Sequence, residues 1–238
     1  MIKTVIKNEL RSIVRDPLYF FFAIYPIILG TAGYFLVDYM EDTTPVPWPQ
    51  VLAMFFIIMT GYIFGALTAF TLLDDKDDKV LMSLKITPID VKTYVYVKLA
   101  VSYVFGLIAT IVITFATGFL SGSPIWVIIL ISVLAALQGP GVVLIVNSLS
   151  ENKVEGFVYM KMSGLILILP VIAFFYTAWQ EAFLIIAPGF WSARLIQIEL
   201  IPTMETNFTF IVYFIFGVLY NLLFTWLFMK LYAKKSNL

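Results

Sequence analysis

The chain has 238 residues, of which 61% are hydrophobic and only 13% are charged. Soluble domains are typically about 45–50% apolar and about 25% charged, so this composition excludes a water-soluble globule. Cysteine and histidine are absent, which excludes disulfides, Cys/His metal sites and mechanisms that need a histidine base. The 15 cationic and 15 anionic side chains balance, so no nucleic acid is expected as a partner.

Residues 1–16 are predicted to form an amphipathic helix that lies at the membrane surface. Four cations recur at every fourth residue, and aliphatic residues fill the neighbouring arc of the helical wheel. These cations are Lys3, Lys7, Arg11 and Arg15. The same pattern also fits a simple topology anchor.

Six apolar stretches are long enough to cross the membrane, since a helix needs about 20 residues to span the hydrocarbon core. They are Leu18–Val37, Gln50–Leu73, Leu99–Leu120, Pro124–Val146, Phe157–Ala178 and Phe208–Met229. Lipid cannot satisfy free backbone groups, so each stretch is predicted to be a helix. The fold class expected is an all-α membrane protein with six transmembrane helices, formed by residues 1–238 as a single domain.

The cations predict the orientation of these spans. Six crossings place all but one of the 15 Lys and Arg residues on the same side of the membrane, and the exception is Arg194. By the positive-inside rule both termini are expected in the cytoplasm of a cell with the chain in its plasma membrane.

The loop of residues 74–98, between the second and third spans, is the longest predicted cytoplasmic connection. We expect its acidic run to begin a short helix that Lys85 ends, with Pro88 beyond it. Val80, Leu81 and Leu84 share one face and predict an exposed apolar ridge for docking. A solvated loop tied down by lysine–aspartate contacts is the alternative.

The same loop contains an Asp-Asp-x-x-Asp pattern formed by Asp74, Asp75 and Asp78. In prenyl-transferring enzymes such a pattern holds Mg²⁺ against a diphosphate, because hard carboxylates suit that ion. Those enzymes need a second, facing acidic cluster, which this sequence does not offer. A Mg²⁺-dependent prenyl or lipid-processing enzyme is therefore an alternative rather than the main prediction.

Within the spans the sequence has no ionisable pair of the kind that ion-coupled pumps use. The polar side chains either bond neighbouring helices or line a pathway. They include Thr110, Thr114, Thr117, Gln138, Asn147 and Asn221. Residues 138–141 (Gln-Gly-Pro-Gly) are expected to kink or break the fourth span, and Pro170 to bend the fifth.

Residues 179–206, before the last span, are apolar but are interrupted by Pro188-Gly189 and by charged residues. The apolar runs are too short to cross. We expect an extracellular re-entrant segment of two short helices in the outer leaflet, with Pro188-Gly189 as the corner.

In their order and topology, three motifs resemble those of ABC type-2 exporter permeases. They are Leu84-Lys85-Ile86-Thr87-Pro88-Ile89 after the second span, Glu151-Asn152-Lys153-Val154-Glu155-Gly156 before the fifth, and Ala187-Pro188-Gly189-Phe190-Trp191 before the sixth. The acidic run before the first of these motifs departs from the family pattern, because the family often has a Gly-Thr pair where this chain has its aspartates.

The resemblance implies that the loop helix is a coupling helix seated in a separate ATPase subunit. The implied contacts are Asp75, Asp78, Val80, Leu81, Leu84, Lys85 and Pro88. It further implies two ATPase subunits and a second permease subunit, identical or paralogous. The chain has no phosphate loop, so ATP and Mg²⁺ would be bound by the ATPase, and this chain would be a non-catalytic permease without a cofactor.

We therefore expect an export permease for an amphipathic substrate, either a hydrophobic peptide or a drug such as an antibiotic, with lipid as a further option. The alternatives are the Mg²⁺-dependent enzyme and an immunity or sensor protein of the membrane that transports nothing.

Overall fold

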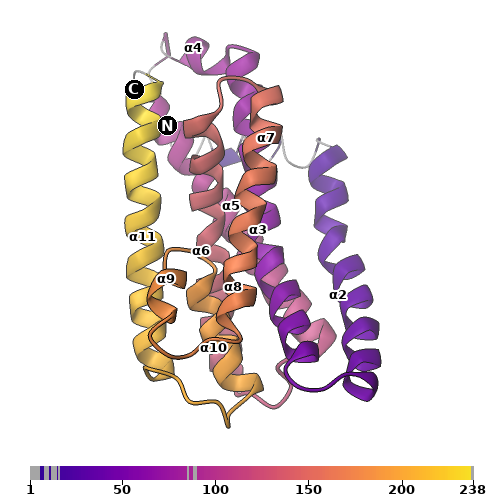
Figure 1. The fold of residues 1–238 in the computed structure, drawn as a ribbon. Helices are drawn as coiled ribbons and strands as arrows, with labels where there is room; N and C mark the ends of the chain where they lie inside the picture. The colour runs from indigo at the N-terminus through magenta and orange to yellow at the C-terminus, as the bar shows by residue number, and fades with distance from the viewer. Residues whose placement is uncertain are drawn as a thin grey trace.

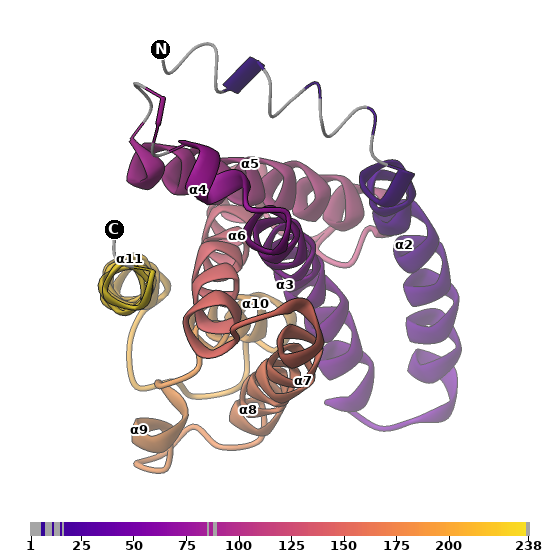
Figure 2. The ribbon, with the colours of Figure 1, turned by 90° about the horizontal axis from the view of Figure 1, so that it is seen from above.

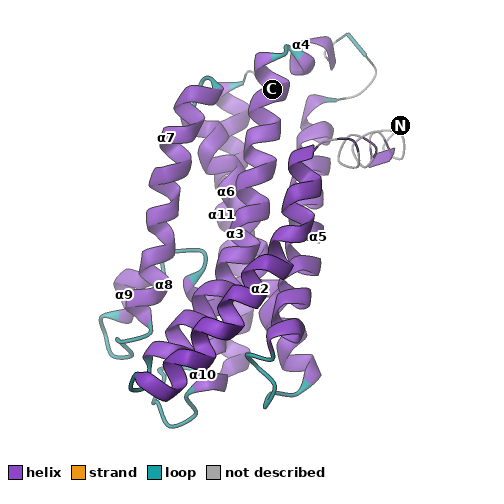
Figure 3. Cartoon of the chain, turned by 90° about the vertical axis from the view of Figure 1, so that its right-hand side faces the viewer, coloured by secondary structure: helices purple, strands orange, loops and turns teal. Residues whose placement is uncertain are grey.

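The computed structural model describes residues 6–7, 11, 15, 17–84, 86–87 and 90–236. Every regular element in these residues is helical (Figure 3), which confirms the predicted all-helical fold. The α-helices are α2 (Pro17–Thr43), α3 (Trp48–Asp77), α4 (Val80–Leu84), α5 (Val91–Thr117), α6 (Ile125–Leu149), α7 (Lys153–Gly164), α8 (Ile168–Ala173), α9 (Glu181–Leu184), α10 (Phe190–Leu200) and α11 (Phe210–Lys235). A 3₁₀ turn, η1 (Leu165–Leu167), joins α7 to α8.

Helices α3 and α6 form the centre of the bundle, and α5 packs against both. Viewed from above in Figure 2, α2 and α11 lie on opposite sides of this centre, and α7 and α8 cover a third side. Figure 1 shows α4 and the C-terminus at one end of the bundle, with α9 and α10 towards the other. We call these the α4 end and the α9 end.

Two glycines one helical turn apart allow α3 to approach α6 closely. A Cβ atom at Gly65 would lie 2.6 Å from the carbonyl oxygen of Gly139, and one at Gly61 would overlap the carbonyl of Ala135. Small residues at this spacing let two helix backbones come together without side chains between them. This close contact joins α3 and α6, the two helices at the centre of the bundle.

Local sequence explains several helix ends. Gly118 adopts a left-handed conformation (φ 67°) directly after α5, the conformation in which glycine commonly ends a helix. The side chain of Asn152 accepts a hydrogen bond from the backbone N–H of Glu155 and caps α7. These two caps define where the third and fifth predicted spans stop and start.

Five helical segments are long and apolar enough to cross a membrane: α3, α5, α6, α11 and the run from Lys153 to Ala173. The first predicted span lies inside α2, which is 27 residues long and packs against α3 and α5. Whether α2 also crosses the membrane, which would make six spans, stays a prediction.

Two features differ from what the prolines and glycines led us to expect. Helix α6 runs unbroken through the buried residues 138–141, so the predicted break is wrong and a kink there stays a prediction. The fifth span ends at Ala173 rather than Ala178, and its helix is interrupted at Leu165–Leu167. Pro170 has no N–H for the carbonyl of Ile166, which explains the interruption one turn before it.

Candidate functional site

A buried ion pair stands at the α4 end, where α3 meets α5. The Nζ atom of Lys98 lies 2.8 Å from a carboxylate oxygen of Asp75, and the two side chains are only 4% and 20% exposed. The hydroxyl of Tyr94 donates to the same carboxylate oxygen at 2.9 Å. Asp75, predicted to touch an ATPase subunit, is thus held inside the chain by two partners from α5.

The loop between α6 and α7 is fastened to the same end of α3. Lys153 pairs with Asp74 at 2.6 Å, and its backbone N–H donates to the carboxylate of Asp77. The carbonyl of Ser150 accepts a hydrogen bond from Lys235 at 2.9 Å and a long one from Lys76 at 3.5 Å. The α4 end therefore joins α3, the α6–α7 loop and the end of α11 through charged side chains.

The acidic run does not begin the short helix, as the sequence predicted, but continues α3 to Asp77. Carboxylates at a helix C-terminus are unfavourable on their own, and here Lys98 and Lys153 compensate for their charge. The chain then turns at Lys79, whose φ is +59°, and α4 follows as a helix of five residues.

The predicted exposed ridge on α4 is wrong for Leu81. That side chain is 8% exposed and packs with Leu72, Leu73 and Tyr232, and Leu84 is half-buried against the same cluster. The apolar ridge is therefore turned into the bundle. The exposed apolar side chains here are Met82 (68%) and Ile86 (89%).

The other predicted contacts divide between exposed, half-buried and undescribed positions. Asp78 is exposed and Val80 is half-buried. In the predicted surface helix, Lys7, Arg11 and Arg15 are exposed. Three of the predicted residues lie outside the described part of the chain, namely Lys3, Lys85 and Pro88.

The aspartates of this end are not arranged as a magnesium site. Asp74 and Asp75 point to lysines rather than to each other. Within the described ranges, no three acidic side chains gather as a metal would require. The Asp-rich alternative therefore gains no support from the geometry.

The threonines of α5 bond their own helix. Thr110 donates to the carbonyl of Gly106, Thr114 to that of Thr110, and Thr117 to that of Ile113. All three are buried, and of these only Thr117 also lines one of the cavities described below.

The three predicted amides bond carbonyls outside their own helices, two on α3 and one in the turn before α10. Gln138 donates to the carbonyl of Ile58 at 2.7 Å, Asn147 to that of Ala69 at 3.1 Å, and Asn221 to that of Pro188 at 3.3 Å. Each is buried in a helix contact, so a role in lining a pathway stays a prediction that requires these helices to separate.

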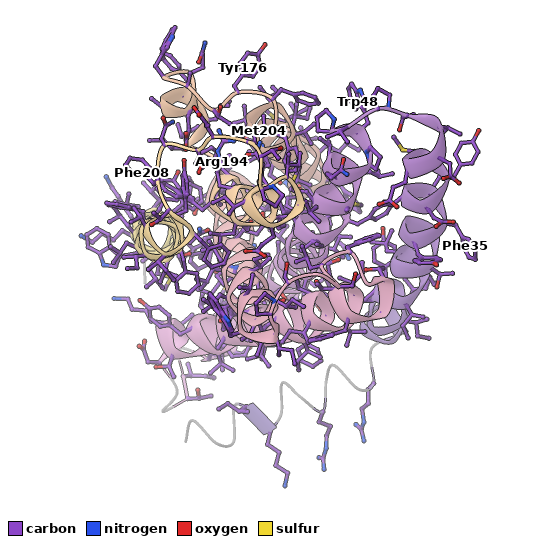
Figure 4. All side chains as sticks on the ribbon, turned by 90° about the horizontal axis from the view of Figure 1, so that it is seen from below. Phe35, Trp48, Tyr176, Arg194, Met204 and Phe208 are labelled. Carbon is purple, nitrogen blue, oxygen red and sulfur yellow. The ribbon has the colours of Figure 1, made fainter. Side chains whose placement is uncertain are left out.

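The α9 end contains a charged cluster that the sequence analysis did not single out. Arg194, on α10, is fully buried and donates through its terminal nitrogens to the carbonyls of Ala173 and Tyr176 and to the side chain of Gln197. Figure 4 shows Arg194 enclosed by the segments around Tyr176 and Met204. Burial lowers the pKa of the Arg194 guanidinium, and the Glu181 carboxylate opposes that shift.

Glu181, at the start of α9, completes this cluster. One of its oxygens accepts a 2.6 Å hydrogen bond from the hydroxyl of Tyr213, and the other accepts one from Asn207. The Oε1 atom of Glu181 lies 3.5 Å from Nε of Arg194, so the two side chains form an ion pair, although this Nε–H makes no hydrogen bond. The signal in the sequence was Arg194 itself, the one cation on its side of the predicted topology. Its partners Ala173, Tyr176 and Glu181 are too far away in the sequence to be found by spacing.

Two cavities open near this end. One, of about 340 Å³, lies among α2, α3 and α5, and its acidic residues are Asp38 and Glu41. The other, of about 650 Å³, lies among α9, α10 and the start of α11, with aromatic side chains making up half of its lining residues and with Glu181 and Asn207 in it. Small-molecule sites are typically clefts of roughly 300–1,000 Å³ with apolar walls and a few polar groups.

Several long apolar helices packed in one bundle define the chain as a multi-pass helical membrane protein. It belongs to the Rv2686c-like family, described as fluoroquinolones export permease protein Rv2686c-like, whose family model matches residues 9–229. The resemblance to export permeases is confirmed at this level.

Two curated relatives are similar to almost the whole chain. They are the fluoroquinolones export permease proteins MT2760 of Mycobacterium tuberculosis strain CDC 1551 / Oshkosh and Rv2686c of strain ATCC 25618 / H37Rv. Each is 24% identical over 247 residues, which cover 96% of this chain and 92% of the relative. No solved structure matches this chain with significance.

Proposed function

We propose that this chain is the membrane-spanning subunit of an ATP-driven exporter that moves an amphipathic drug out of the cell. The observation that carries the proposal is membership of an export permease family over residues 9–229. The relatives are named for fluoroquinolones, so an antibiotic of that class is the first substrate to test.

In this proposal the chain lies in the plasma membrane, and its α4 end faces the cytoplasm. It collects Lys76, Lys98, Lys153 and Lys235, as the positive-inside rule requires of the cytoplasmic side. With α2 as the first of six spans, both termini are cytoplasmic. Two copies of an ATPase subunit bind below, and a second permease subunit, identical or paralogous, completes the pathway.

Docking of the ATPase uses the outer surface of α4 and the turn after it. Met82 and Ile86 project their apolar side chains there, and the exposed Asp78 precedes them. Exposed apolar side chains rimmed by polar residues are typical of protein interfaces. Leu81, in contrast, is turned inward and belongs to a buried apolar cluster with side chains of α3 and α5.

The test is ATP-dependent uptake of norfloxacin into inside-out vesicles that contain this chain and its ATPase subunit. The variant Met82→Asp places a charge on the docking surface, and we expect uptake to fall by about tenfold or more, the equivalent of one lost hot-spot contact. Val46→Asp, at an equally exposed apolar residue in the loop between α2 and α3, is the matched control and should leave uptake unchanged.

Uptake that proceeds equally well without ATP would overturn the proposal of an ATP-driven exporter. If Met82→Asp and Val46→Asp behave alike at equal protein levels, the docking surface lies elsewhere.

A further inference from the structure

We propose that the 650 Å³ cavity at the α9 end is a binding site for an amphipathic organic cation with an aromatic or other apolar body. The cavity is an open cleft among α9, α10 and the start of α11. The proposal deepens the export function proposed above and rests on it for its physiological meaning. The binding itself requires neither nucleotide nor an ATPase.

The wall of this cavity is largely aromatic. Trp191 stacks on Phe216 with ring centres 6.4 Å apart, and Phe208 lies 6.4 Å from Phe216 and 5.5 Å from Tyr213. Trp179 completes the lining from the segment before α9. Aromatic faces attract cations through their quadrupole, most strongly where water is excluded. The wall therefore suits both a flat apolar body and a positive charge.

The charged group of this wall is a carboxylate. Glu181 lines the cavity, and so do Asn207 and Tyr213, whose side chains hydrogen-bond its two oxygens. Arg194, which forms an ion pair with Glu181 at 3.5 Å, does not line the cavity. The negative member of the pair thus faces the cavity while the positive member lies behind it, which favours a cationic ligand.

The cavity can also admit a ligand without unfolding the cluster beneath it. Phe208 and Phe216 are about half exposed, at 52% and 51%, and Trp179 is more exposed still. Figure 4 shows Phe208 at the rim beside α11, with Arg194 further inside. The aromatic wall can therefore move around a ligand while Arg194 and its carbonyl partners stay in place.

The experiment measures binding of tritiated tetraphenylphosphonium to the purified full chain in dodecyl maltoside, by equilibrium dialysis against empty micelles. We expect binding that the uncharged triphenylphosphine oxide does not displace. Glu181→Gln keeps the shape of the side chain but removes its charge, and it should weaken binding by about tenfold or more. Phe208→Ala and Phe216→Ala, at half-exposed positions that leave the buried cluster intact, should weaken it by a similar factor.

Two control variants match these changes elsewhere. Glu199→Gln removes a carboxylate on α10 that bonds Ser123 and does not line the cavity. Phe35→Ala removes an exposed aromatic ring from α2, which lies across the bundle from Phe208 and α11 (Figure 4). Both should bind like the unchanged chain. The proposal is overturned if tetraphenylphosphonium does not bind, if triphenylphosphine oxide displaces it equally well, or if the controls weaken binding as much as the cavity variants.

A second arm identifies where such a cation comes from. Displacement of tetraphenylphosphonium by added phosphatidylethanolamine supports the site with a lipid ammonium headgroup as its occupant, and no displacement supports it with a soluble amphiphile. Binding that obeys these expectations while vesicles show no ATP-dependent uptake would overturn the export function and leave the site standing. Loss of binding in Phe216→Ala with full norfloxacin uptake would instead separate the site from transport.

Discussion

The two ends of the bundle both hold acid–base pairs, but they bury them to different depths. At the α4 end, Lys153 and Asp74 are 44% and 39% exposed, and Lys98 with Asp75 is more enclosed. At the α9 end, Arg194 is fully buried and Glu181 nearly so. Water can replace a partner in the exposed Lys153–Asp74 pair, whereas the guanidinium of Arg194 is closed off from it.

This difference indicates different mechanical roles. The exposed Lys153–Asp74 pair can break and reform at little cost, so this part of the α4 end can change shape if the proposed ATPase docks there. A guanidinium held by two carbonyls and an amide in a dry cluster has no such freedom. We expect movement to begin at the α4 end and the α9 cluster to travel as a rigid body.

The largest effect is expected from Arg194→Met. It removes the positive charge opposite the buried Glu181 carboxylate and the donors to the carbonyls of Ala173 and Tyr176, and breaking a buried pair in this way typically costs about 3–5 kcal/mol. Unfolding by sodium dodecyl sulfate in mixed micelles would measure the loss. Arg11→Met, at an exposed position, is the control and should change little. The double variant Arg194→Met with Glu181→Leu should recover part of the loss, and no recovery would contradict the ion pair.

An intermediate effect is expected from Asp75→Asn. The change removes the charge opposite Lys98 but keeps an oxygen for the hydroxyl of Tyr94. Because the pair is partly exposed, we expect a cost of about 1–2 kcal/mol, between the surface and buried limits. The same unfolding assay applies. A loss as large as that of Arg194→Met would remove the contrast between the two ends.

The smallest effect is expected from Asp74→Asn. Its partner Lys153 is nearly half exposed, and exposed pairs contribute about 0–1 kcal/mol. Unfolding at low and at high salt should give nearly the same midpoint for this variant, whereas the unchanged chain should lose its small advantage as salt rises. A salt-independent loss above 2 kcal/mol would show that Asp74 acts through the backbone instead.

The apolar spans could be predicted from the sequence because length and hydropathy are local properties. All six predicted stretches overlap long helical segments, and the segment before the last span contains two short helices with Pro188-Gly189 between them. Where these short helices lie relative to a bilayer stays a prediction. The predicted end of the fifth span at Ala178 was wrong, since the helix ends at Ala173, and the interruption at Leu165–Leu167 lies one turn before Pro170.

The details of the candidate sites depended on contacts that no periodicity reveals. The acidic run continues α3 rather than starting α4, because Lys98 and Lys153, distant in the sequence, compensate for its charge. On α4 itself, Leu81 is buried and Met82 is exposed, the reverse of the predicted ridge at Leu81. Apart from Gln197 on its own helix, the partners of Arg194 come from the end of α8, from α9 and from the segment between them, and only the fold brings them together.

The carbonyl of Ser150 has a consequence for how the protein is assembled. It accepts its 2.9 Å hydrogen bond from Lys235, which is translated 85 residues later. During biosynthesis the loop after α6 must therefore wait, incompletely bonded, until the last helix has left the ribosome and inserted. A fusion partner or purification tag is best attached beyond Lys235 through a spacer, so that the hydrogen bond between Lys235 and Ser150 can still form.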